Sequence, residues 1–104
     1  MAKLKYLWTH GDNGKQEYYD TTVNGTYLLV FKNRWDSCWM CSVGDRMIHD
    51  KTRNDLQRKK QGLPKGCHPS LLLRDAMLCS NDPTKLMKKV EYCFEHNLDE
   101  ISSK

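Results

Sequence analysis

Long apolar runs are absent from this sequence, and their absence sets the first limits on what the chain does. No stretch approaches the roughly 18 apolar residues that a transmembrane helix needs. The basic N-terminus is followed by Tyr6, Trp8 and Thr9 rather than by the apolar segment of a secretory signal peptide. We therefore expect a cytoplasmic protein with no membrane partner.

Motifs that carry catalysis are also missing. The sequence has no Gly-x-Ser-x-Gly nucleophile elbow, and the pair Gly11 and Gly14 lacks the rest of any phosphate-binding fingerprint. Acid–base chemistry by His49 with Asp45 or Asp50 is an alternative, but an ordinary surface role explains these side chains better. The sequence therefore predicts a protein that is not an enzyme and holds no cofactor.

The strongest structural signal that is present lies in residues 16–43. Asn24-Gly25 stands between two runs of strand-forming residues, and Asn-Gly is the preferred pair for a two-residue type I′ hairpin turn. The run after the turn, residues 26–31, is apolar at nearly every position, which is typical of a strand buried on both faces. The hairpin therefore predicts the centre of a sheet.

Alternation and turn residues place the other strands around this hairpin. Leu4, Tyr6 and Trp8 recur at every second position, as in a strand with one apolar face. The glycine-rich residues 10–14 then read as a loop. We expect strands over residues 3–9, 16–23, 26–31 and 37–43, and a short fifth strand over 46–49.

The C-terminal part predicts a helix. Asp82 and Pro83 have the chemistry of an N-cap and a first helical position. Apolar residues then recur at spacings of three and four, forming one stripe: Leu86, Met87, Val90, Cys93, Phe94 and Leu98. Residues 70–78 read as a short helix, with a buried strand as the alternative, and we expect the chain after Leu98 to fray.

These elements predict a fold of the α+β class. The expected architecture is an antiparallel β-meander of four to five strands with a C-terminal helix packed on one face, because that helix is what can cover the apolar sheet. A chain of 104 residues forms one domain. We divide residues 1–104 into a sheet over 3–49, a basic loop over 50–69 and a helical part over 70–98.

Five cysteines are an odd number, which favours free thiols over a disulfide framework. Cys38 and Cys41 form a C-x-x-C pair that, with Cys67 and His68, makes a formal zinc set. In a strand, however, residues three apart point to opposite faces. We therefore expect no metal at Cys38, Cys41, Cys67 and His68, and a small zinc-binding protein is the alternative.

Positive charge is concentrated in residues 51–65. Six basic residues against one acidic residue give this segment a net charge of +5, while the whole chain has +4. Because residues 62–66, Gly-Leu-Pro-Lys-Gly, break a helix, we expect a long exposed loop with at most one helical turn near Asn54 to Lys60. Such a loop can meet a phosphate backbone or an acidic protein surface.

The candidate binding residues follow from this loop and from one polar turn. The sequence lacks the aromatic motifs of RNA-recognition domains and the pattern of double-stranded RNA-binding domains. Trp35 next to Arg34 is either an exposed interface residue or one end of the core. The candidate set is Arg34, Trp35, Lys51, Arg53, Arg58, Lys59, Lys60 and Lys65.

The overall pattern resembles small bacteriophage-encoded proteins of the inhibitor type. The resembling parts are the Trp8 strand, the hairpin at 23–27, the strand from Trp39 to Val43 and the C-terminal helix. The resemblance implies a non-enzymatic, anti-defence (anti-CRISPR-like) inhibitor that occludes a host protein or a nucleic-acid-handling complex in the host cytoplasm. The basic segment 51–65 lies outside the resemblance, and a nucleic-acid-binding accessory protein that uses this segment is the alternative.

Overall fold

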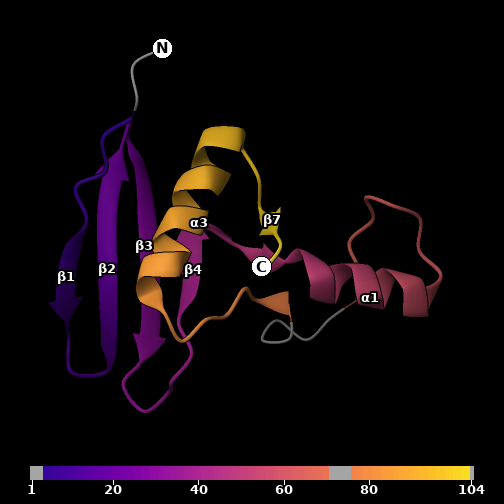
Figure 1. The fold of residues 1–104 in the computed structure, drawn as a ribbon, viewed down its shortest axis with the longest axis horizontal. Helices are drawn as coiled ribbons and strands as arrows, with labels where there is room; N and C mark the ends of the chain where they lie inside the picture. The colour runs from indigo at the N-terminus through magenta and orange to yellow at the C-terminus, as the bar shows by residue number, and fades with distance from the viewer. Residues whose placement is uncertain (1–3, 71–75, 104) are drawn as a thin grey trace.

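A five-stranded antiparallel sheet forms the larger part of the molecule (Figure 1). The computed structural model describes residues 4–70 and 76–103. The strands follow one another in sheet order as they do in the chain: β1 (Thr9–Asp12), β2 (Gln16–Val23), β3 (Thr26–Asn33), β4 (Met40–Val43) and β5 (Arg46–Met47). This order is that of a meander, so the predicted α+β class and antiparallel topology are confirmed.

The β2–β3 hairpin has the predicted turn. Val23 and Thr26 face each other across the end of the ladder, so the loop has two residues. Asn24 and Gly25 have φ angles of 51° and 79°. Positive φ at both positions is what a type I′ turn requires, and its twist matches that of the two strands.

Helix α3 (Pro83–His96) begins and ends at clear capping residues. Asp82 Oδ1 accepts hydrogen bonds from the backbone N–H groups of Thr84 (3.0 Å) and Lys85 (3.4 Å), which have no partner inside the helix. Asn97 ends the helix in the left-handed conformation, with φ of 53°. The predicted helix start is confirmed.

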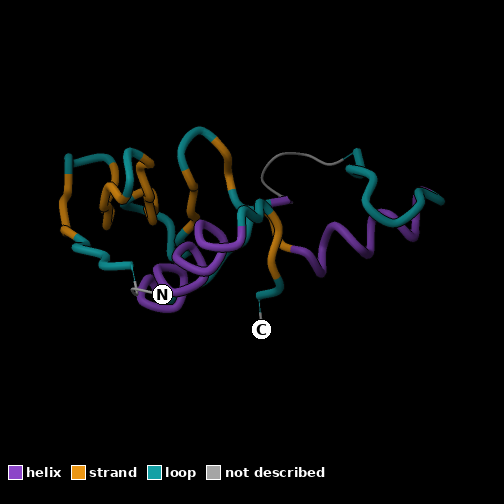
Figure 2. The backbone as a smooth tube through the Cα atoms, turned by 90° about the horizontal axis from the view of Figure 1, so that it is seen from above, coloured by secondary structure: helices purple, strands orange, loops and turns teal. Residues whose placement is uncertain are grey.

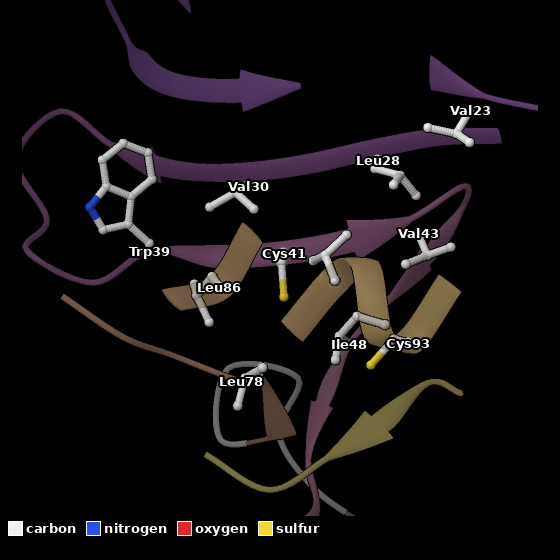
Figure 3. Packing of buried hydrophobic residues seen from close by; sticks show 11 residues of the cluster. Val23, Leu28, Val30, Trp39, Cys41, Val43, Ile48, Leu78, Leu86 and Cys93 are labelled. Atoms are coloured by element: carbon white, nitrogen blue, oxygen red, sulfur yellow. The ribbon is translucent and has the colours of Figure 1, made fainter. Parts of the chain in front are cut away.

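The core lies between α3 and one face of the sheet (Figure 3). Every second residue of β3 and β4 points at the helix, and register pairs Leu28 with Val43 and Val30 with Cys41. The helical stripe supplies the other side, in which Leu86, Val90 and Cys93 are fully buried. Burial of apolar surface at this interface is the main stabilising contribution to the domain.

The predicted first strand is wrong in its position. Strand β1 spans Thr9–Asp12, which includes part of the expected loop, and the described residues 4–8 pair with no strand. Tyr6 and Trp8 are half-buried and pack against the core cluster instead.

The reason lies on α3. The Tyr6 hydroxyl donates to Glu95 Oε2 (2.7 Å), and the Trp8 indole N–H donates to Glu91 Oε2 (2.8 Å). The alternation in residues 4–8 therefore buries one side of an extended segment against the helix and its acidic side chains rather than against a neighbouring strand.

The predicted basic loop is wrong, because residues 51–61 form a helix. Strand β6 (His49–Asp50) leads directly into α1 (Lys51–Gln61). Asp50 Oδ1 accepts from the backbone N–H groups of Thr52 (2.9 Å) and Arg53 (3.5 Å). Gly62, with φ of 68°, then ends the helix. Gly62 and Pro64 thus lie beyond the helix rather than within it.

The C-terminal residues are also ordered, in contrast to the expected fraying. Strand β7 (Glu100–Ile101) pairs in parallel with β6. The predicted strands over 37–43 and 46–49 are shorter than expected, since β4 begins at Met40 and Ile48 separates β5 from β6.

The predicted short helix over residues 70–78 falls largely on residues 71–75, outside the described residues. At its described end, Met77 forms a β-bridge with His49, and the Leu78 N–H donates to the Ile48 carbonyl (3.0 Å). Among the helices of the described ranges, none combines the length and the apolar character needed to cross a membrane.

We predict that Val90→Asp unfolds the domain. Val90 has no exposed surface in the core, and an unpaired carboxylate there costs several kcal/mol, against a total stability of about 5–15 kcal/mol. Thermal melting followed by circular dichroism measures the effect. Lys88→Asp, on the exposed side of the same helix, is the matched control and should melt within a few degrees of wild type. A normal melting curve for Val90→Asp would contradict the helix-on-sheet core.

Candidate functional site

Helix α1 stands away from the sheet at one end of the molecule, and we call it the arm (Figures 1 and 2). It buries two residues, Asn54 and Arg58, and both are polar. The predicted binding residues of this region are exposed except for one: Lys51, Arg53, Lys59, Lys60 and Lys65 are exposed, whereas only 8% of Arg58 is accessible. Arg58 must therefore be removed from the candidate binding set.

Arg58 holds the arm in place. Its guanidinium donates two parallel hydrogen bonds to the Glu100 carboxylate (2.8 and 2.7 Å). Its Nε–H donates to the Cys67 carbonyl (2.6 Å), and Nη1 also donates to Asp55 (2.7 Å). One side chain therefore ties the helix to β7 and to the segment that follows the helix. Hydrogen bonding from Arg58 also lowers the pKa of Glu100, so the carboxylate is charged at neutral pH.

Two further polar contacts fix the arm. The Asn54 side-chain amide lies 3.4 Å from His49 Nδ1, and Asn54 is almost fully buried. The Gln61 side chain forms two hydrogen bonds with the backbone of Ser70, donating to its carbonyl (2.8 Å) and accepting from its N–H (3.0 Å). The segment after α1 is therefore folded back along the helix.

The outward face of the arm presents charge around one apolar side chain. Leu56 is 52% exposed. Positions three and four apart share one side of a helix, so Arg53, Lys59 and Lys60 flank Leu56 on that face. We call these four residues the arm face. All four point away from the buried Arg58 and Asn54, and three of them belong to the predicted set.

A hollow of about 360 Å³ lies at the base of the arm. Its lining mixes both signs of charge, with Lys51, Lys65 and His68 against Asp55 and Asp99. The Arg58–Glu100 pair forms part of the same wall. Because these charges offset one another, the hollow does not have the one-sided potential of a phosphate site.

Trp35 is exposed, at 79% of its surface, which decides between the two interpretations of this residue. It lies in the connection from β3 to β4, and Arg34 next to it donates from Nη1 to the Gly14 carbonyl (3.3 Å). Arg34 and Trp35 thus belong to the end of the sheet near the β1–β2 turn. The predicted binding residues therefore occupy two separate parts of the molecule.

The four residues of the formal zinc set do not converge. Cys41 is buried in β4, whereas Cys67 and His68 are exposed in the segment after α1. Among residues 4–70 and 76–103, no group of three or more Cys, His, Asp or Glu side chains is arranged to hold a metal ion. Burial raises the pKa of the Cys41 thiol and raises that of Cys93 to about 11, so both stay protonated at neutral pH.

The face of the sheet that points away from α3 is a site that the sequence analysis did not identify. Register brings Tyr18 opposite Phe31 and Asp20 opposite Leu29 on this face. A hollow of about 260 Å³ lies over them. The residues are spread over two strands, so only the strand register could have revealed the arrangement.

Comparison of the chain with known protein families, with curated proteins and with solved structures found no match. The candidate surfaces therefore rest on geometry, burial and charge within this chain.

We predict that acid loosens the arm. The pKa of Glu100 is lowered in the folded protein, so its ion pair stabilises the arm above the usual glutamate pKa of about 4.3 and loses that effect as pH falls below it. The amide signals of α1, followed by NMR from pH 7 to pH 3, should shift toward those of an undocked helix. Glu100→Gln should show these shifts already at pH 7 and flatten the pH dependence.

Asp99→Asn is the matched control for Glu100→Gln. Asp99 is the neighbouring carboxylate, and it contributes its backbone carbonyl rather than its side chain to the His49 N–H (2.8 Å). The control should behave like wild type. Signals of α1 that do not change in Glu100→Gln would contradict the role of the ion pair.

Proposed function

We propose that this protein is a small non-enzymatic binding protein that presents the arm face to an acidic surface of a partner protein. The observation that supports the proposal is the arrangement of Arg53, Lys59 and Lys60 around the exposed Leu56. Basic side chains on a projecting helix speed encounter with an anionic surface and fix the orientation of docking.

Leu56 favours a protein over a nucleic acid as the partner. A phosphate backbone offers hydrogen-bond acceptors and charge but little apolar surface against which a leucine gains by burial. A groove on a protein can receive an apolar helical side chain with flanking charges at spacings of three and four. The arm face has this combination.

The rigid attachment of the arm supports the same function. The hydrogen bonds of Arg58 and Gln61 fix the helix before any partner arrives. A binding element that is already ordered loses less conformational entropy on association. The high charge of α1 is thus compatible with a folded recognition helix rather than with a flexible tail.

An occluding inhibitor is the specific form of the proposal. The resemblance of the sequence to small bacteriophage inhibitor-type proteins supports it, with a host protein or protein–nucleic-acid complex as the target. In this form the arm provides the charged contact, and the rest of the domain provides bulk that blocks the surface of the target.

The test reverses charge on the arm face and leaves Arg58 intact. Tagged wild type is used to capture its partner from cell lysate, and the purified partner is then measured by surface plasmon resonance. Lys59→Glu with Lys60→Glu should slow association about tenfold at low salt and change dissociation less, because steering acts on the encounter. Lys85→Glu with Lys88→Glu makes the same charge change on the exposed side of α3 and should leave binding unchanged.

Leu56→Ser separates the two classes of partner. For an acidic protein it should speed dissociation, since the leucine is then buried in the complex. For nucleic acid, measured with a random-sequence DNA duplex, Leu56→Ser should have no effect. In that case each lost phosphate contact should flatten the slope of log K against log salt by about 0.7–0.9. Equal weakening by the α3 control variant, or no effect of the arm variant at any salt concentration, would contradict the proposal.

A further inference from the structure

The second surface that carries chemistry is the uncovered face of the sheet. Figure 2 shows α3 on one side of the strands, and no described helix lies on the other side. The alternate side chains of β2 and β3 on that side include three aromatic rings, those of Tyr18, Tyr27 and Phe31. These rings line the hollow of about 260 Å³.

Asp20 is the charged residue in the lining of this hollow. Its Oδ2 accepts from the Tyr27 hydroxyl (2.6 Å), and its Oδ1 accepts from the Thr9 hydroxyl (2.5 Å). Both donors are neutral, and Asp20 forms no ion pair with any residue of the described ranges. A carboxylate has about four lone-pair sites, so each oxygen can accept one further hydrogen bond.

The two hydroxyls hold this carboxylate in one orientation. Burial and the hydrogen bond to Asp20 raise the pKa of Tyr27 to about 12, so its hydroxyl remains a donor at neutral pH. The two oxygens of Asp20 are thereby fixed side by side, as bidentate recognition requires.

The Tyr18 ring is held in place by the strand next to it. Gly11 lies opposite Tyr18 in the β1–β2 ladder. A Cβ atom on residue 11 would come within 2.4 Å of Tyr18 Cζ, so the ring occupies the space that any other residue at position 11 would fill. One wall of the hollow is therefore formed before a ligand binds.

We propose that this hollow binds the guanidinium group of an arginine side chain from a partner chain. Asp20 accepts two parallel N–H bonds from the guanidinium, and the rings of Tyr18, Tyr27 and Phe31 supply cation–π contact and exclude water. Arginine fits better than lysine, because its planar fork matches the two carboxylate oxygens and its face stacks on aromatic rings. Complementary charge identifies the ligand, since the hollow combines one unpaired carboxylate with aromatic rings.

Nα-acetyl-arginine methylamide is the probe, and NMR titration of the wild-type protein is the measurement. The backbone amides of Tyr18, Asp20, Tyr27 and Phe31 should shift together in a saturable manner. The citrulline analogue has the same shape without the charge and should bind at least tenfold more weakly. Equal shifts with both probes, or no shift at the hollow with the arginine probe, would overturn the proposal.

Asp20→Asn removes the charge and retains a side chain that can hydrogen-bond with Thr9 and Tyr27. It should abolish the preference for the arginine probe over the citrulline probe. Glu17→Gln is the matched control on the opposite face of β2, where Glu17 contacts His10, and it should bind like wild type. If Asp20→Asn fails to fold, Tyr18→Leu tests the aromatic wall and should weaken the arginine probe at least threefold. Unchanged binding in whichever of these two variants folds would overturn the proposal.

The lysine probe and the arm variants complete the test. Nα-acetyl-lysine methylamide should bind more weakly than the arginine probe, and tighter binding would contradict the assignment to guanidinium. The Lys59→Glu, Lys60→Glu variant should bind the arginine probe like wild type, because the arm is separate from the hollow. Loss of probe binding in that variant would also contradict a site on the sheet.

Discussion

The chain has one apolar helix for a sheet that has two faces, and this constraint shapes the molecule. Helix α3 buries Leu86, Val90 and Cys93 against one face, and that interface supplies most of the apolar burial. No second amphipathic helix within the described residues is available for the other face. The rings of Tyr18 and Phe31 are therefore left partly accessible, and recognition chemistry can occupy a surface that the fold does not use.

The arm is held by a different kind of interaction. Helix α1 brings no buried aliphatic side chain to the domain, so its position depends on the hydrogen-bonded ion pair of Arg58 and Glu100 and on caps at Asp50 and Gly62. Removal of one partner from such a pair typically costs about 3–5 kcal/mol, because the other charge stays buried. Orientation of the arm therefore depends on charge and geometry, whereas stability of the sheet depends on apolar area.

Local signals made β2, β3 and α3 predictable. Asn24-Gly25 and Asp82-Pro83 act within a few residues, and the apolar stripe of α3 repeats along one segment. Helix α1 was not predicted because it has no such stripe, and its fixing partner Glu100 lies far away in the sequence. The exposure of Trp35 could be proposed but not decided. The hollow around Asp20 could not be found, since only strand register brings its residues together.

The separation of 42 positions between Arg58 and Glu100 has a consequence for the order of folding. The β2–β3 hairpin closes over two residues, whereas docking of α1 must wait until β7 has paired beside β6. Contacts between residues that are distant in sequence form late, because the intervening chain must first lose its freedom. The most highly charged helix of the protein therefore spends the early part of folding as an unattached segment, and its basic side chains reach their final positions only in the last steps.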